Sequence, residues 1–425
     1  MTNAQNAAIL HLRPSDPGRT AIVEYAEHFH EALKRIPNHD CLDFFSGGLD
    51  ENIDATEKVS AIRDYVREKA STHTADKGAG IIVHMEQGNA LHREFWAGYF
   101  LQRLLPRARF YATIHDPPKL CSNPFRYVPT EFEGRTPLRL LNVALTKLAE
   151  TRVQWRKNRI EARFVRDCEG VVALSEGGRA SLEKHPLFIE TENHFLPHVF
   201  NLKSLSHDPF KGQKSDEEKN KPKISTQPLR IVMFCYLGPN KGTEETIEAF
   251  DLLCERLKKD SRHIPLPTLG IFGGVSQGFQ ADHYLETIRE RIGKSAQTSR
   301  IEFSPGFVGR DERDRRLAAA DIIVLPYRTV PTAFSSAGAI RALALGKAVV
   351  AANTNTLPEV VLHGESGLLF DEKSPADYAD VLYQLCVDSD LRRRLGFGAR
   401  RLIESRHTPD KIARRLARIY GIGWN

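Results

Sequence analysis

Short apolar segments alternate with longer amphipathic segments along most of the chain. In the N-terminal half, runs of apolar residues predict strands at AAILHLR, CLDFF, GIIVHM, RFYATIH and GVVALS. Between them, the spacing of apolar positions predicts helices near residues 22–36, 61–72, 95–105 and 137–166. This alternating order of strands and helices predicts a parallel sheet with helices on both faces.

The alternation restarts after the polar segment GQKSDEEKNKPK, which has no apolar residue able to anchor a core. Strands are then predicted at LRIVMFCY, TLGIFGG, IEFSPGF and DIIVLPY, with helices over 243–258, 282–292 and 311–320. We therefore predict an α/β protein of two Rossmann-like, doubly wound parallel-sheet domains facing a cleft. The predicted bounds are 1–210 for the first domain, 211–227 for a linker, 228–406 for the second domain and 407–425 for a terminal helix.

Composition supports two domains and argues against several kinds of binding partner. The 425 residues are enough for two separate cores. A formal net charge of +6 is too small to indicate nucleic acid. No window approaches the ~18 apolar residues of a membrane span, and the first residues lack a signal-peptide pattern, so we expect a cytoplasmic protein. No cluster of acidic or histidine residues predicts a metal, and we expect no cofactor.

A lysine follows the first predicted strand of the second domain, in the segment FCYLGPNKGTEETIEAF. The strand ends at Gly238, and Lys241 and Gly242 come just before a predicted helix. An ammonium group at a strand end can contact a diphosphate, while glycine lets the backbone approach closely. The alternative is an ordinary turn with a solvated lysine.

A second candidate site follows the strand DIIVLPY, where a polar turn leads into a helix predicted near Ser335–Leu345. Ser335 and Ser336 fit the first turn of this helix. Its unpaired backbone N–H groups and its dipole form a site for an anion, to which serine hydroxyls can add donors. The equally simple alternative is that the serines only cap the helix.

Together these segments resemble the donor domain of retaining glycosyltransferases of family 4, which have the GT-B fold. The resemblance covers about Leu229–Arg406 and rests on the order of GPNKG with TIEAF, FSPGFV, DIIVLPY, ALALGKAVVAAN, LPEVV and HGESGLLFD. It implies that Lys241 holds the donor diphosphate. It also implies donor contacts at Gly238, Gly242, Phe307, Ser335, Ser336 and Glu359. In this family the last helix crosses back to the N-terminal domain, which we expect of residues 407–425.

The chain departs from the family pattern at three positions. Tyr236 stands where the family has an arginine, and Ala333 and Arg341 stand where it has two glutamates that contact sugar and ribose hydroxyls. A guanidinium cannot accept those hydrogen bonds. One interpretation is a variant branch in which Arg341 or Arg328 supplies the missing positive charge. The other is a degenerate site that no longer turns over.

The N-terminal half resembles the acceptor domain of the same family less closely. RFYATIHDPP ends a strand at His115, which matches the family histidine facing the transferred sugar. There it would position the sugar and support charge, because the leaving diphosphate can itself take the acceptor proton. The loop SDPGRTAIVEY matches at Gly18, and Arg19 could add a phosphate contact. For His84, in IIVHMEQG, a packed or solvated role is the expectation.

The predicted helix 137–166 carries many basic residues, with Trp155 and Phe164 interleaved among them. This pattern is consistent with peripheral docking on anionic lipid headgroups, or with a solvated helix face. The function we predict is hexosyl transfer from a UDP- or GDP-sugar to a glycan or lipid-linked saccharide. The alternative is a catalytically silent, nucleotide-binding scaffold subunit of a glycan-assembly complex.

Overall fold

The computed structural model describes residues 7–14, 21–45, 59–71, 80–87, 93–120, 151–152, 155–210, 227–275 and 281–424. The chain divides into two compact units. Unit 1 is Met1–Leu196 with Ala413–Asn425, and unit 2 is Pro197–Ile412. The domain and linker bounds predicted from the sequence, 1–210, 211–227 and 228–406, remain predictions.

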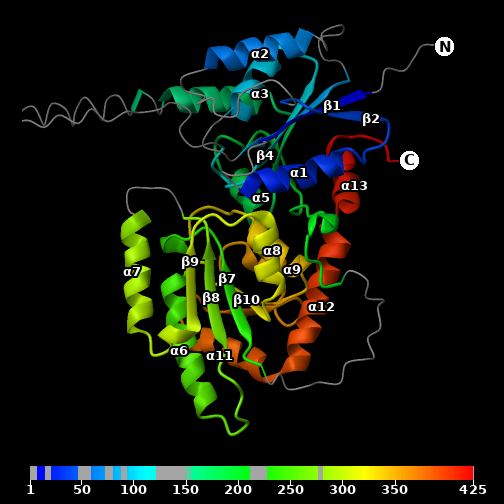
Figure 1. The fold of residues 1–425 in the computed structure, drawn as a ribbon. Coiled ribbons are helices and arrows are strands. Elements are labelled where there is room, and N and C mark those ends of the chain that lie inside the picture. Colours follow the sequence, from blue (N-terminus) through cyan, green and yellow to red (C-terminus); the bar gives the residue numbers. More distant parts are fainter. Residues whose placement is uncertain are drawn as a thin grey trace, which may run out of the picture. The chain divides into compact units, whose positions relative to one another are not determined.

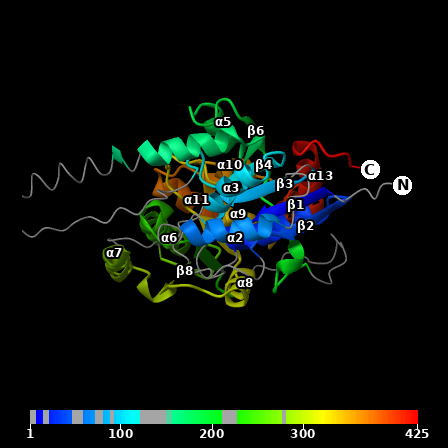
Figure 2. The ribbon, with the colours of Figure 1, turned by 90° about the horizontal axis from the view of Figure 1, so that it is seen from above.

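Unit 1 contains a parallel sheet with the strand order β2-β1-β3-β4-β5-β6. Its strands are β1 (Ala7–Leu12), β2 (His39–Asp43), β3 (Ile82–Gln87), β4 (Arg109–Ile114), β5 (Gly170–Ala173) and β6 (Glu192–Phe195). Its helices include α1 (Ala21–Leu33), α2 (Val59–Ser71), α3 (Arg93–Leu104), α5 (Glu176–Glu183) and most of α13 (Pro409–Ile419). Figure 1 shows α2 and α3 on one side of the sheet and α1 and α13 on the other. In Figure 2 the neighbouring strands β1, β2 and β3 lie side by side, as their pairing requires.

The core of unit 1 is apolar on the face that α2 and α3 cover. Phe95 of α3 packs on Phe164, with ring centroids 5.3 Å apart, and both rings are buried. The opposite face is different, because its centre holds buried polar side chains. They are His11 of β1, His84 and Glu86 of β3, and Thr113 of β4. A parallel sheet covered on both faces normally buries apolar residues, so this polar group needs hydrogen-bond partners.

Unit 2 contains a second parallel sheet, with the order β12-β11-β10-β7-β8-β9. The strands are β7 (Arg230–Phe234), β8 (Thr268–Gly273), β9 (Ile301–Pro305), β10 (Ile322–Leu325), β11 (Ala348–Ala352) and β12 (Leu368–Phe370). The helices are α6 (Thr243–Lys258), α7 (Ala281–Lys294), α8 (Arg310–Ala318), α9 (Ala337–Ala344), α10 (Leu357–Val360), α11 (Pro375–Val387) and α12 (Ser389–Arg406). Helix α6 packs with α7 and α11, whereas α9 packs with α12, and the sheet lies between these two groups (Figure 1).

The strand order reverses once in each sheet. In unit 2 the chain proceeds from β7 through β8 to β9 and then returns to β10 on the other side of β7. In unit 1 the reversal lies between β1 and β3. Successive connections leave the sheet in opposite directions at such a point, which opens a crevice at the carboxyl ends of the strands. The predicted α/β class with two doubly wound sheets is confirmed.

Gly242, between β7 and α6, has a backbone that only glycine accommodates. Its φ is +69°, and a Cβ added there would lie 1.9 Å from the carbonyl oxygen of Pro326, just after β10. The turn after β7 therefore approaches the end of β10 more closely than a side chain would allow.

We expect Gly242→Ala to lower the free energy of unfolding by about 2 kcal/mol or more, because it adds a clash to an unfavourable φ. The measurement is urea unfolding followed by circular dichroism. Gly309→Ala is the matched control, because a Cβ there meets nothing within 4 Å. Equal stability of the two variants would contradict this account of the turn.

Candidate functional site

The turn after β7 presents Lys241 at the point where the strand order of unit 2 reverses. Gly238 is extended, a short 3₁₀ turn spans Pro239–Lys241, and α6 begins at Thr243. The Lys241 amide donates to the Gly238 carbonyl at 3.0 Å, and the Arg328 amide donates to the Asn240 carbonyl at 3.1 Å. The segment after β10 is thus bonded directly to the lysine turn.

Two aromatic rings from the segment after β10 flank the Lys241 ammonium. Its Nζ lies 4.2 Å from the ring centroid of Tyr327 and 4.9 Å from that of Phe334. Burial raises the pKa of Tyr327 above its ordinary value, so its hydroxyl stays protonated, 3.4 Å from Ser336 Oγ. Cation–π contacts therefore help to hold the ammonium at the strand end.

The first turn of α9 begins beside these rings. Ser336 is its N-cap, and its Oγ accepts a hydrogen bond from the Ala339 amide at 3.1 Å. This is the capping role that the sequence left open. Ser335 is partly exposed just before it.

The segment after β11 completes this end of the sheet. Asn355, with φ of +51°, accepts a hydrogen bond from the Val330 amide and donates one to the Arg328 carbonyl, both at 3.0 Å. Glu359 follows in α10 and is partly buried. Three neighbouring strands, β7, β10 and β11, are therefore each followed by a polar turn at the carboxyl-end side of the sheet.

The other predicted donor residues have different surroundings. Arg328 pairs with Glu245 at 3.2 Å and is more than half exposed. Arg341 is buried, pairs with Asp314 of α8 at 2.6 Å and stacks over the ring of Phe200. Its described partners lie outside the lysine turn, so its guanidinium links two helices of unit 2. Phe307 is 66% exposed after β9, on the far side of β8 from β7.

In unit 1, His115 follows β4 and contacts a buried carboxylate. Its Nε2 lies 2.9 Å from Oε2 of Glu86, and the Tyr25 ring meets its imidazole edge to face at 4.9 Å. The predicted residues Gly18 and Arg19 lie outside the described residues.

Glu86 is the centre of a network that the sequence analysis did not single out. Its Oε1 lies 3.6 Å from His11 Nε2 and 3.7 Å from His84 Nε2. Burial alone would raise the pKa of Glu86, but the neighbouring His11 and His115 imidazoles overcome this effect and lower it to about 2. Burial lowers the pKa of His84 to about 3 and that of His30 to about 4. Glu86 is therefore ionised, and His84 and His30 are neutral at pH 7.

Alternation within β3 was the signal that could have found this network. His84 and Glu86 are two residues apart in a strand that begins with apolar residues, so they share one face of the sheet. Among the described residues, no group of three or more His, Cys, Asp or Glu side chains is arranged to hold a metal ion.

Known structures with this architecture define the fold. Sucrose-phosphate synthase from Thermosynechococcus elongatus matches with a TM-score of 0.63 and 18% identity, covering 98% of each chain. The Anabaena protein HepE in complex with UDP matches with a TM-score of 0.61 and 16% identity, covering 97% of this chain and 99% of that one. The chain has the two-domain GT-B fold of glycosyltransferases.

Sequence relatives point to the same class. Residues 214–402 match the family model described as "Glycosyl transferases group 1". The GDP-mannose-dependent alpha-(1-6)-phosphatidylinositol monomannoside mannosyltransferase of Mycobacterium tuberculosis is 27% identical over 249 residues, which are 58% of this chain and 57% of that protein. The D-inositol 3-phosphate glycosyltransferase of Jonesia denitrificans is 34% identical over 173 residues, which are 40% and 38% of the two chains. The chain thus spans about half the length, or less, of these relatives.

The buried histidines predict acid-sensitive stability for unit 1. They are neutral when folded and bind protons below about pH 6.5 when unfolded, so their stabilisation is full above pH 6.5 and falls as the pH drops towards 4. Between about pH 7.5 and 5.5 we expect a loss of roughly 1 kcal/mol for each of His30 and His84. All three tryptophans belong to unit 1, so their emission during urea unfolding reports on it. His84→Gln should reduce this pH dependence, and an unchanged slope in that variant would contradict the assignment.

Proposed function

We propose that this chain is a glycosyltransferase that moves a hexose from a UDP- or GDP-linked sugar to a glycan or lipid-linked saccharide. The observation that carries the proposal is the edge formed by the turns after β7, β10 and β11, with Lys241 held at the reversal of strand order. The match of residues 214–402 to a glycosyltransferase family and the activities for which the relatives are named support it. The reaction would contribute to polysaccharide or glycoconjugate biosynthesis.

In this proposal unit 2 binds the donor and stabilises the leaving diphosphate. The Lys241 ammonium and the first-turn amides of α9 provide positive charge at one edge, where charge develops as the sugar leaves. Tyr327 and Phe334 hold the lysine in place, so little ordering remains to be done when the donor binds.

The departures from the family pattern shape the rest of the site. Arg341 is already paired with Asp314, which argues against its acting as the replacement cation for the diphosphate. Arg328 is also paired, with Glu245, but it is more than half exposed, so it is the better candidate for that charge. Glu359 remains as a carboxylate able to accept hydrogen bonds from sugar hydroxyls. We place the chain in a variant branch of family 4 and propose retention of configuration, without a bound metal.

His115 is the proposed contact to the transferred sugar in unit 1. It would position the sugar and support charge, with the leaving diphosphate accepting the proton of the acceptor. His115→Ala should therefore abolish transfer while donor binding persists.

Donor binding and transfer with Lys241→Ala test the main proposal. Loss of a charge-assisted contact should weaken binding of the cognate nucleotide about 10- to 100-fold, because such contacts contribute ~1.5–3 kcal/mol. UDP, GDP, UDP-glucose and GDP-mannose are compared by calorimetry, and transfer is measured by nucleotide release with saccharide acceptors. The matched control is Lys258→Ala, an exposed lysine at the other end of α6.

The two candidate functions give different outcomes in this experiment. Binding and transfer that both fall in Lys241→Ala support the enzyme. Donor binding without hydrolysis or transfer, for every acceptor tried, supports the silent scaffold instead. No binding of any of the four nucleotides would overturn both.

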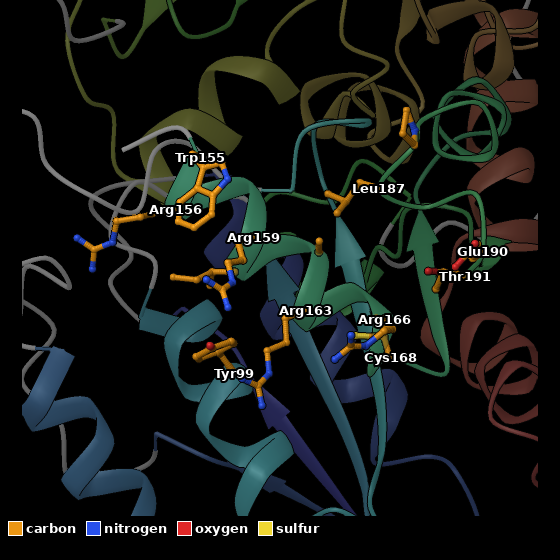
Figure 3. A pocket seen from close by; sticks show the side chains of 13 residues that line it. Tyr99, Trp155, Arg156, Arg159, Arg163, Arg166, Cys168, Leu187, Glu190 and Thr191 are labelled. Carbon is orange, nitrogen blue, oxygen red and sulfur yellow. The ribbon is translucent and has the colours of Figure 1, made fainter. Parts of the chain in front are cut away.

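We also propose that unit 1 docks on anionic lipid headgroups. Residues 155–166 form a helix beside a cavity of about 880 Å³. Figure 3 shows the four arginines of this helix that line the cavity, Arg156, Arg159, Arg163 and Arg166. Trp155 at the helix start is 61% exposed, and Arg159 lies 5.4 Å from the centroid of its ring. Clustered guanidinium groups with an exposed tryptophan complement an anionic interface. None of the described helices is long and apolar enough to cross a bilayer.

Sedimentation with vesicles at low salt tests this docking. The protein should sediment with vesicles containing phosphatidylserine and not with pure phosphatidylcholine. Replacing the four arginines with glutamine should reduce the bound fraction at least ~10-fold, because each contributes about 1 kcal/mol near an anionic surface. The control variant removes the same charge from exposed positions of unit 2, Arg289, Arg393, Arg394 and Arg401. Equal loss in both variants, or no sedimentation of the wild type, would show a solvated helix face instead.

A further inference from the structure

Glu86 is a buried carboxylate at the carboxyl end of β3, beside the point where the strand order of unit 1 reverses. It is 1% exposed, and its described ion-pair partners are the three histidines His11, His84 and His115. A carboxylate at this depth is stable only when hydrogen bonds replace the water it has lost. The direction of those hydrogen bonds determines what each imidazole can do.

One oxygen of the Glu86 carboxylate, Oε1, is the end of a chain of side-chain hydrogen bonds. The Tyr420 hydroxyl lies 2.7 Å from His84 Nδ1, and His84 Nε2 lies 2.8 Å from Thr113 Oγ1. The Thr113 hydroxyl in turn donates to Glu86 Oε1 at 3.5 Å. These contacts form a directional chain, in which Tyr420 donates to His84, His84 to Thr113 and Thr113 to the carboxylate.

The other oxygen faces His115. Glu86 Oε2 lies 2.9 Å from His115 Nε2, and an ionised carboxylate can only accept. His115 must therefore carry its proton on Nε2. In the neutral imidazole, the opposite ring nitrogen, Nδ1, then carries the lone pair.

The His115 ring is fixed in place as well as in tautomer. Tyr25 of α1 packs against it at an interplanar angle of 86°, and the His115 side chain keeps 10% of its surface exposed at the strand end. The ring therefore has a bonded nitrogen facing inward while part of it reaches the surface of unit 1.

We propose that Glu86 is a positioning residue, which selects the Nε2–H tautomer of His115 so that Nδ1 accepts a hydrogen bond from a sugar hydroxyl. The proposal deepens the function proposed above, on which the identity of the hydroxyl rests. The tautomer itself depends only on unit 1 and can be measured without any substrate.

Polar and titratable side chains from several elements surround Glu86 and His115. His11 lies on β1, His84 on β3 and Thr113 on β4, while α1 supplies Tyr25 and His30. Tyr420 follows α13. The Nδ1 atoms of His30 and His11 are 3.2 Å apart. The His11 ring therefore lies between His30 and the Glu86 carboxylate.

Nitrogen-15 NMR of histidine-labelled full-length protein tests the tautomer directly. The His115 signal is assigned by its loss in His115→Gln, and spectra are recorded near pH 8. We expect a protonated Nε2 and an unprotonated Nδ1. A protonated Nδ1, or an even mixture of tautomers, in the wild-type protein would overturn the proposal.

Glu86→Gln tests the cause, because its amide can donate to Nε2 and allow the proton to move to Nδ1. We expect a swapped or mixed tautomer, a kcat for transfer lowered about 10- to 100-fold and a donor KM changed less than ~2-fold. Glu86→Asp should restore the tautomer and part of kcat. An Nε2–H signal unchanged in Glu86→Gln would show that the carboxylate does not select it.

Two controls separate this proposal from its alternatives. Tyr420→Phe removes the hydroxyl that bonds to His84 but leaves Glu86 and His115 in contact, so the His115 tautomer should stay as in the wild type. If Glu86→Gln fails to fold, as judged by tryptophan emission, the wild-type and Glu86→Asp spectra decide the question. An Nε2–H tautomer in a protein that transfers no sugar would defeat the proposed function and leave the positioning role standing.

Discussion

Parallel pairing of the strands is the constraint on which both candidate sites depend. The twelve described strands form two sheets in which each strand runs parallel to its neighbours. The carboxyl ends of all strands in a sheet therefore lie on the same side of it, and the turns that follow the strands come together there. Where the strand order reverses, between β7 and β10 or between β1 and β3, these turns have room for polar side chains. Lys241 and Glu86 each lie at such a reversal.

The polar groups at the two reversals of strand order differ in their burial. In unit 2 the polar groups are mostly backbone amides and side chains near the surface, with Lys241 held by aromatic rings. In unit 1 they are buried, and a single carboxylate accepts hydrogen bonds from the His115 imidazole and the Thr113 hydroxyl. Burial makes the second arrangement costly if any partner is missing, because an unpaired charge in a low-dielectric interior loses its hydration without compensation. The network also binds the end of the chain, through Tyr420, to the sheet of unit 1.

Two basic residues of unit 2 differ in their surroundings. Lys241 lies at a strand end, and its ammonium contacts the Tyr327 ring beside it. Arg341, one turn into α9, is buried against Asp314, which neutralises its charge. In the proposed function, an ammonium and helix amides would therefore act at these strand ends instead of the carboxylate pair of the family pattern.

Hydrophobic periodicity by itself determined the α/β class, the strands and most helices. The predicted helix 243–258 coincides with α6, and the predicted helix near Ser335–Leu345 contains α9, because apolar spacing follows each helix face directly. Strand-end motifs singled out Lys241 and His115 as candidate site residues. Tertiary structure alone decided that Arg341 faces Asp314, that Tyr327 and Phe334 flank Lys241, and that His11, His84 and Glu86 meet. These contacts join residues far apart in the chain, and strand order, which local patterns do not encode, brings them together.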